Sequence, residues 1–262
     1  MRATFFERLR QAARARGSLL CVGLDPDPER IAGGAAGALR HCAEVVERTA
    51  EHACCYKPNA AFWEQYGSDG WRALMELRDR IPADVPVLLD AKRGDMPHTM
   101  AAYARAAFEV LGADAVTVSP YPGADALAEF TRFADRGVYV LCRTSNPGAP
   151  DLQHLEAAGR PLYLHVAELA ERLNGAGNVG LVVGATAPDQ LERVRAASSL
   201  PFLVPGVGSQ GGDLERAVRA AWNGDDASCL VPVSRSILFA EDPGREAARL
   251  RRAIGAVLAA AR

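Results

Sequence analysis

Short, almost continuously apolar segments recur along the chain, and each is followed by a segment in which apolar residues return with helical spacing. Strands that are apolar at every position are typical of a parallel sheet, whose strands are buried on both faces. The pattern predicts strands over residues 18–24, 53–57, 85–91, 113–119, 138–143, 179–184, 202–207 and 228–233. It predicts helices over residues 39–52, 70–80, 99–111, 124–134, 160–174, 188–197, 213–223 and 244–261.

About eight strands alternating with about eight helices predict an α/β protein, a closed (β/α)8 TIM barrel in a single domain over residues 1–262. A doubly wound open sheet also fits the alternation, but eight units favour closure. No linker rich in Pro, Gly or Ser divides the chain. Residues 146–159 contain Pro and Gly and are interpreted as a mobile loop, and residues 33–37 as a flexible loop or a weak helix start.

Composition narrows the class of protein. With 24% charged residues and a formal net charge of -2, the chain gives no indication of a nucleic-acid or membrane partner. No apolar run approaches the roughly 20 residues of a membrane span, and the stretch 18–24 is too short for a secretory signal. The six cysteines form no CxxC pair and lie mostly in apolar runs, which favours buried free thiols over disulfides. We therefore expect a cytoplasmic protein.

Charged and hydrogen-bonding residues stand where the predicted strands should leave the core. In a (β/α)8 barrel the catalytic groups gather at the carboxyl ends of the strands and in the loops that follow them. We therefore expect one shared site on one rim of the barrel. The candidates, in chain order, are Asp25, Lys57, Asp90, Lys92, Asp95, Ser145, Asn146, Gln210, Ser234 and Arg235.

The segment from Val85 to Thr99 carries the densest charge of these strand ends. Side chains alternate along a strand with a period of two, so Asp90 and Lys92 should lie on the same face. Desolvating each charge costs several kcal/mol, and only close mutual pairing recovers that cost. An inert ion pair would explain these two residues alone, but the further carboxylate of Asp95 makes a catalytic cluster the favoured interpretation.

The glycine-rich segment after the seventh predicted strand, together with Arg235, predicts a phosphate-binding site. Glycines leave backbone N–H groups free to approach an anion, and a helix is predicted to start at Asp213. A guanidinium suits phosphate, and the loops after strands seven and eight are the usual phosphate site of this fold. The string GVGSQG also fits GxGxxG, but it lies far from a first βαβ unit, so no dinucleotide is expected. The glycines are Gly206, Gly208, Gly211 and Gly212.

Each candidate taken alone also has a structural explanation. Lys57 could extend from a strand end to solvent, and Asp25 stands in a DPDP segment typical of turns. Ser145 precedes an Asn-Pro-Gly turn, and Arg235 could cap a helix or lie on the surface. The five histidines show no metal-ligand spacing, so no metal site is expected. Taken separately, these explanations do not account for the expected position of all these residues at one rim of the barrel.

Together, the motifs VGLDPDP, YKPN, DAKRGD with a downstream Thr, TSNPG, VVGAT, PGVGSQGGD and SRS resemble the orotidine 5'-phosphate decarboxylase family in its longer bacterial branch. The resemblance covers nearly the whole chain, and DAKRGD is its most specific motif. It implies a (β/α)8 barrel that forms a homodimer with shared active sites. It also implies conversion of orotidine 5'-monophosphate to UMP in de novo pyrimidine biosynthesis, with neither metal nor cofactor.

The resemblance also implies roles for individual residues. Lys92 would stabilise and protonate the carbanion at C6 of the pyrimidine, and Asp95 would reach into the site of the partner subunit. Ser234 stands where many relatives have glycine, and we expect only a local change in that loop. The implied catalytic residues are Lys57, Asp90, Lys92 and Asp95. The implied substrate-binding residues are Asp25 for the ribose, Met96 and Thr99 for the partner's pocket, Ser145 for the pyrimidine edge, and Gln210 with Arg235 for the phosphate.

Two other functions fit part of the pattern. Sugar-phosphate decarboxylases and aldolases of the same barrel lineage, which stabilise an enediolate with Mg²⁺, also carry Asp-x-Lys-x-x-Asp. The KRGD run, Ser145 and Gln210 favour the nucleotide enzyme over these relatives. The second alternative is a catalytically silent barrel that binds a phosphorylated metabolite, but a mere binder has no reason to sustain the desolvation cost of the charged array.

Overall fold

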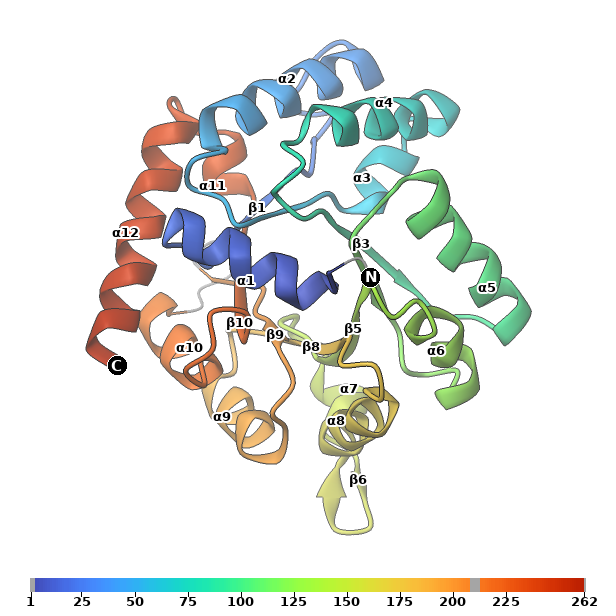
Figure 1. Cartoon of the computed structure of the whole chain (residues 1–262). Helices are drawn as coiled ribbons and strands as arrows, with labels where there is room; N and C mark the ends of the chain where they lie inside the picture. The colour runs from blue at the N-terminus through green and yellow to red at the C-terminus, as the bar shows by residue number, and fades with distance from the viewer. Residues whose placement is uncertain (1–2, 208–212, 262) are drawn as a thin grey trace.

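Eight parallel strands form the centre of the computed structural model, which describes residues 3–207 and 213–261 (Figure 1). Their order around the sheet is β2-β1-β10-β9-β8-β5-β4-β3. The two end strands also meet, because Tyr56 N donates to Pro86 O and Asp90 N donates to Pro58 O, at 3.0 and 2.9 Å. The predicted (β/α)8 barrel is therefore confirmed. The strands are β1 (Leu20–Gly23), β2 (Cys55–Lys57), β3 (Leu88–Arg93), β4 (Ala115–Val118), β5 (Gly137–Arg143), β8 (Val179–Val183), β9 (Phe202–Leu203) and β10 (Cys229–Val233).

Helices surround the barrel and cover the outer face of the sheet (Figure 1). Every predicted strand and helix has a counterpart, with ends that differ by a few residues. The main helices are α2 (Gly34–Thr49), α4 (Gly67–Arg80), α5 (Pro97–Arg105) with the π-helix η1 (Ala106–Val110), α6 (Ala124–Thr131), α8 (Leu162–Leu173), α9 (Pro188–Ala197), α10 (Leu214–Ala221) and α12 (Pro243–Ala261).

Several elements were not predicted from the sequence. Residues 146–159, interpreted as a loop, contain α7 (Pro150–Gln153) and most of a small antiparallel hairpin, β6 (Glu156–Ala157) with β7 (Arg160–Pro161). The weak helix start at residues 33–37 is the first turn of α2. Three further short or terminal helices are α1 (Phe5–Arg16), α3 (Ala60–Glu64) and α11 (Arg235–Leu238).

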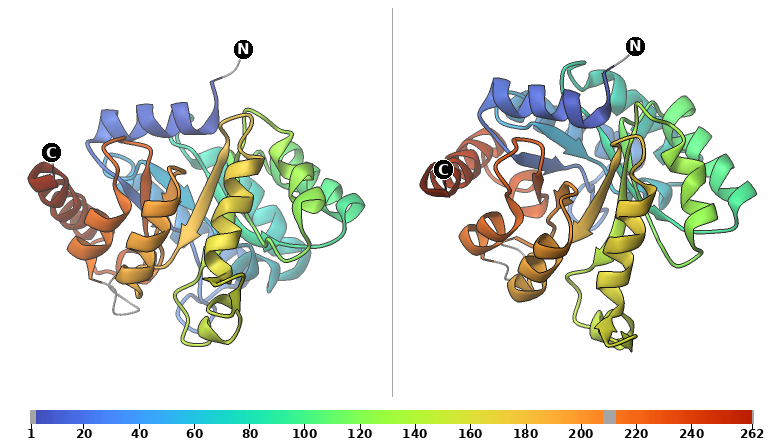
Figure 2. Two further views of the ribbon diagram at one scale, coloured as in Figure 1. Left: turned by 90° about the horizontal axis from the view of Figure 1, so that it is seen from below. Right: turned by 60° about the horizontal axis from the view of Figure 1, so that its bottom comes forward.

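Helix α1 lies across the amino-terminal ends of the strands, and the β6–β7 hairpin projects from the opposite end of the barrel (Figure 2). Thr4 and Glu7 form a reciprocal capping box that starts the helix. Phe5 and Phe6 both contact Tyr139 of β5 edge-on, with ring centroids 6.1 and 5.8 Å apart. The helix therefore closes the barrel base with apolar side chains.

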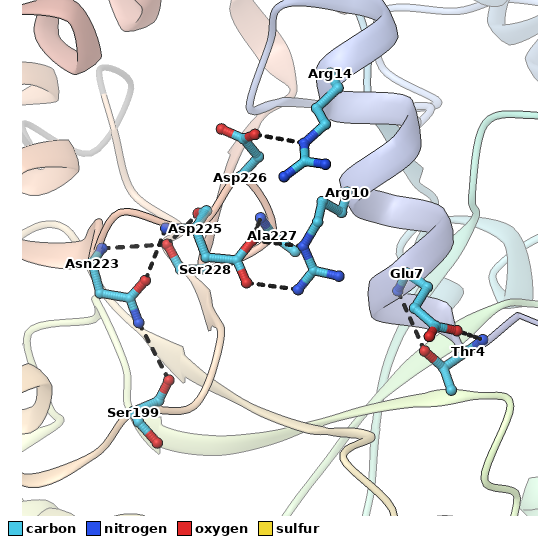
Figure 3. A network of polar contacts seen from close by, with 10 residues as sticks. All are labelled: Thr4, Glu7, Arg10, Arg14, Ser199, Asn223, Asp225, Asp226, Ala227 and Ser228. Atoms are coloured by element: carbon cyan, nitrogen blue, oxygen red, sulfur yellow. Dashed lines mark hydrogen bonds and ion pairs between the residues drawn. The ribbon is translucent and has the colours of Figure 1, made fainter. Parts of the chain in front are cut away.

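Charged side chains fasten the other end of α1 to the segment before β10. Arg10 forms a bidentate pair with Asp225, at 2.8 and 2.6 Å, and Arg14 donates to Asp226 at 2.9 Å (Figure 3). Asp225 also accepts from the backbone N–H of Ala227. The turn that leads into β10 is thus held both by α1 and by hydrogen bonds among its own residues, such as that from the Ser228 hydroxyl to Asp225 O.

Asp114, just before β4, is the most connected charge at this end. Its carboxylate is 3% exposed and accepts from Arg8 at 2.5 Å and from the N–H of Val87 at 2.8 Å. Arg78 and Arg136 lie 3.4 and 3.6 Å from the same carboxylate. One buried anion therefore joins α1, α4 and the segments that enter β3, β4 and β5.

The six cysteines are free and buried, as predicted. Burial raises the pKa of the Cys142 thiol to about 12, so this thiol stays protonated at neutral pH. Among the described residues, no helix is long and apolar enough to cross a membrane.

We expect Asp114→Ala to lower the free energy of unfolding by about 3–5 kcal/mol, because it leaves three partly buried guanidinium groups without their shared anion. Denaturant unfolding followed by circular dichroism measures the change. Asp69→Ala is the matched control, since its carboxylate is 71% exposed and pairs with Arg72 on the helix surface, and we expect a change within about 0.5 kcal/mol. Equal unfolding midpoints for the two variants would contradict this role of Asp114.

Candidate active site

A cavity of about 510 Å³ opens at the carboxyl ends of the strands, at the end of the barrel opposite α1. This volume is within the range of small-ligand sites. Eight of the ten candidates predicted at the strand ends line it together, and they come from the ends of five strands. They are Asp25, Lys57, Asp90, Lys92, Ser145, Asn146, Ser234 and Arg235.

Asp95, Met96 and Thr99, which were also predicted site residues, are not among the residues that line this cavity. Asp95 is exposed and accepts a hydrogen bond from the N–H of Met96 at 2.7 Å, and the Met96 side chain is 61% exposed. The Thr99 hydroxyl lies 3.2 Å from Nε2 of His98. Gln210 falls outside the described residues. The cavity of one chain is thus formed without the residues expected to serve a partner subunit.

Asp90 is the centre of the charged array. Its Oδ2 accepts from Lys57 Nζ at 3.1 Å, and its Oδ1 accepts from Lys92 Nζ at 2.6 Å. Oδ1 also accepts from the Thr117 hydroxyl at 2.8 Å. The Lys57 and Asp90 side chains are 8% and 12% exposed, whereas that of Lys92 is 46% exposed. One ammonium is therefore buried with the carboxylate, and the other faces the cavity.

Opposing influences set the charges of the buried pair. Burial is the largest influence on Lys57 and lowers its pKa, but the carboxylates of Asp90 and Asp25 outweigh it and raise that pKa above its ordinary value. Burial also acts most strongly on Asp90 and raises its pKa, but Lys57 and Lys92 reverse the direction and hold the pKa below its ordinary value. The pair therefore stays fully ionised at neutral pH.

Lys92 has an unusual backbone conformation, with φ +48° in the left-handed region. That conformation costs a side-chain-bearing residue of order 1 kcal/mol. It occurs where β3 departs from regular register against β4, between Leu89 and Arg93. The N–H of Lys92 donates to the Thr117 hydroxyl at 2.9 Å. As predicted, Asp90 and Lys92 meet on one face, but Lys92 reaches it through a bulge rather than a regular strand.

The loop after β1 is tied to the end of β2. Asp25 Oδ1 accepts from the N–H of Asn59 at 3.1 Å, and Asn59 Oδ1 accepts from the N–H of Ala61 and so caps α3. The indole of Trp63 donates to Leu24 O at 3.0 Å. These bonds place the Asp25 carboxylate beside the Lys57–Asp90 pair.

The turn after β5 is held from two sides. Gln153 of α7 accepts from the N–H of Thr144 and donates to the Thr144 hydroxyl, at 2.9 and 2.8 Å. On the other side, the Thr186 hydroxyl donates to Ser145 O at 3.0 Å. A Cβ at Gly184 would come within 2.9 Å of Ser145 atoms, so only glycine allows this approach. The turn presents Ser145 to the cavity.

The part of the cavity that was predicted to bind phosphate is lined by Arg235 and by Gly206, which follows β9 and has φ +96°. Phe239 lines the same end, with the Arg30 guanidinium 3.7 Å from its ring centroid and the His41 ring stacked at 5.9 Å. The start of α10, expected to face the anion, is capped by this chain's own Asp213, which accepts from the N–H of Arg216 at 3.0 Å. Of the residues predicted to bind phosphate, Arg235 and Gly206 line the cavity, whereas Gly208, Gly211 and Gly212 lie outside the described residues.

Several site residues were missed by the sequence analysis, above all Thr117, Asn59 and Gln153. One compositional signal would have marked the site: Lys57 and Lys92 are the only two lysines in the chain, against 28 arginines. Within the described residues, no three His, Cys, Asp or Glu side chains are arranged to hold a metal ion.

Residues 18–250 match the family model described as orotidine 5'-phosphate decarboxylase / HUMPS family. The chain belongs to this family. A curated relative from Roseiflexus castenholzii, named orotidine 5'-phosphate decarboxylase, is 53% identical over 98% of this chain and 99% of its own length. The resemblance recognised in the sequence is therefore confirmed.

Solved structures of family members agree with the fold. OMP decarboxylase from Leishmania donovani superposes with a TM-score of 0.90 and 48% identity, covering 97% of this chain and 98% of that chain. UMP synthase from the same organism gives a TM-score of 0.93 and 49% identity. This chain spans 56% of the length of that synthase.

The Lys57 ammonium should remain charged to unusually high pH. Because its pKa is raised in the folded protein, the ion pair stabilises the fold below the ordinary value of about 10.4 and is lost only as the pH rises through the folded value. In protein labelled with ¹³C at lysine Cε, the two lysines give two NMR signals. We expect the chemical shift of the Lys57 signal to stay constant as the pH is raised to about 11.

Asp90→Asn removes the paired carboxylate but leaves Lys57 buried. Burial should then lower the pKa of Lys57, so its signal should titrate at a lower pH than in the wild type. A wild-type Lys57 signal that titrates at or below the ordinary value would contradict the pairing.

Proposed function

We propose that this chain decarboxylates orotidine 5'-monophosphate to UMP in de novo pyrimidine biosynthesis, without metal or cofactor. The observation that carries the proposal is the Lys57–Asp90–Lys92 array, with a cavity-facing ammonium held 2.6 Å from a buried carboxylate. The names of the relatives supply the substrate, and the array supplies groups suited to the reaction. Lys57, Asp90 and Asp95 complete the catalytic set around Lys92.

The difficult step is the loss of CO₂ from C6 of the pyrimidine. The C6–carboxylate bond breaks, and its electron pair stays on C6 in the ring plane, where no ring carbonyl delocalises it well. A preorganised cation beside C6 stabilises this charge, and such electrostatic stabilisation is usually the largest contribution to catalysis. Lys92 supplies the cation and then donates a proton from Nζ to C6, which yields UMP. Solvent returns the proton to the amine.

Asp90 keeps Lys57 charged, aligns both lysines, and would lie against the substrate carboxylate. Repulsion between the two anions is relieved as CO₂ leaves. We assign the larger effect to stabilisation of the transition state by Lys92. Its ammonium is already oriented before substrate binds, so little reorganisation is required during the reaction.

Binding energy from the remote parts of the nucleotide would order the site. In this proposal Arg235 and Gln210 bind the phosphate, Asp25 binds the ribose and Ser145 contacts the pyrimidine edge. Phosphate binding can offset the cost of bringing a charged substrate against Asp90. Among these residues, Arg235, Asp25 and Ser145 share the cavity with the lysines.

We further propose a cytoplasmic homodimer in which residues 1–262 form one domain and Asp95, Met96 and Thr99 serve the partner's site. One hydrophobic cluster runs from α1 to α12, which supports a single domain. The exposure of Asp95 and Met96 outside the cavity of their own chain supports the shared site. Free buried thiols suit a reducing compartment.

Lys92→Ala should lower kcat/KM for UMP formation by at least about 1,000-fold, because it removes both the cation and the proton donor. Lys92→Arg should also be strongly impaired, because a guanidinium retains charge but does not give up its proton. The matched control is Arg72→Ala, which removes an exposed cation from the surface of α4. Absorbance loss of orotidine 5'-monophosphate measures each rate.

A wild-type chain that forms no UMP would overturn the proposed function, and a fully active Lys92→Ala would overturn the role of Lys92. Activity should survive dialysis against EDTA. Loss of activity that Mg²⁺ restores would instead point to the enediolate-forming relatives.

Mixing two inactive variants tests the shared site. In a heterodimer of Lys92→Ala with Asp95→Ala, one site receives both a native lysine and a native aspartate if Asp95 acts across the interface. A 1:1 mixture should therefore recover about one quarter of wild-type activity, because about half the dimers are mixed and each has one intact site. If Asp95 acts within its own chain, the mixture stays inactive.

A further inference from the structure

The Thr117 hydroxyl closes a ring of hydrogen bonds around Lys92. The backbone N–H of Lys92 donates to Thr117 Oγ1 at 2.9 Å, and Thr117 Oγ1 donates to Asp90 Oδ1 at 2.8 Å. That same carboxylate oxygen accepts from Lys92 Nζ at 2.6 Å. One hydroxyl therefore connects the backbone and the side-chain end of Lys92 through a single carboxylate.

The charge of Asp90 decides the direction of these bonds. The carboxylate stays ionised and can only accept, so the single hydroxyl proton of Thr117 points to it. A lone pair of Oγ1 is then left for the N–H of Lys92. Valine has nearly the same shape as threonine but offers neither the proton nor the lone pair, whereas serine offers both.

The bulge in β3 explains why a side chain is needed at this point. Between the paired residues Leu89–Val116 and Arg93–Val118, three residues of β3 stand opposite Thr117 alone. The regular ladder is interrupted there, and Lys92 has φ +48°. The hydroxyl of Thr117 accepts the N–H of Lys92 within this interruption, and so stabilises a backbone conformation that a residue with a Cβ disfavours.

Thr117 is 1% exposed and is not among the residues that line the cavity. It therefore acts through its neighbours rather than on the substrate. We propose that Thr117 is a positioning residue: its hydroxyl locks the left-handed backbone of Lys92 to the Asp90 carboxylate, so that Lys92 Nζ is aimed into the cavity. The catalytic consequence rests on the proposed function, whereas the effect on Lys92 itself does not.

Thr117→Val tests this role. We expect kcat to fall by about 10- to 100-fold, as for a misplaced reacting group, while KM stays within about 3-fold of the wild type because the nucleotide contacts remain. Thr117→Ser should restore most of kcat. In protein labelled with ¹³C at lysine Cε, the Lys92 signal should shift or broaden in Thr117→Val. The Lys57 signal should keep its position, because Lys57 bonds the other oxygen of Asp90.

Thr49→Val is the matched control. Thr49 is fully buried in α2, donates to Val45 O at 2.7 Å and lies 2.8 Å from the Tyr56 hydroxyl, so it too loses two hydrogen bonds. It should lower stability without changing the Lys92 signal or the ratio of kcat to KM. If Thr117→Val does not fold, Thr117→Cys gives the same comparison with a weak donor of similar size.

An unchanged kcat and an unchanged Lys92 signal in Thr117→Val would overturn the proposal, as would equal effects from Thr49→Val. If the wild type forms no UMP, the proposed function fails, and the lysine spectrum still decides whether Thr117 positions Lys92.

Discussion

The active rim is organised around one buried carboxylate. The Asp90 side chain is buried, and an ion at such a site is retained only if close partners recover its lost hydration. Lys57 from β2, Lys92 from β3 and Thr117 from β4 satisfy its two oxygens. The three strands are neighbours in a parallel barrel, where their carboxyl ends meet at one rim. The same interactions that make the buried charge tolerable leave one ammonium facing a cavity.

The base of the barrel contains contacts that stabilise the fold, whereas the opposite rim contains the candidate active site. At the base, α1, Tyr139 and the carboxylate of Asp114 join segments from distant parts of the chain. At the rim, loops carry Asp25 and Ser145 to the cavity, and the first residue of α11 is Arg235.

Lysine and arginine are also used at different places in the fold. The chain has 28 arginines and two lysines, and both lysines bind Asp90. A guanidinium serves well where planar, bidentate pairing is needed, as between Arg10 and Asp225. An ammonium is a compact charge that can yield a proton. At the two positions beside Asp90, a compact ammonium lets two cations share one carboxylate, one on each oxygen.

The apolar segments determined the eight strands by themselves, since burial on both faces requires apolar residues whichever partners a strand has. Local spacing also placed Asp90 and Lys92 on one face. Spacing could not reveal the bulge at Lys92, the hydroxyl of Thr117 that faces it from β4, or Gln153 behind the Ser145 turn. Helix α1 was likewise missed, because its apolar face has meaning only against the base of the barrel. These features depend on contacts between segments distant in sequence, so only the closed barrel, which brings the segments together, decided them.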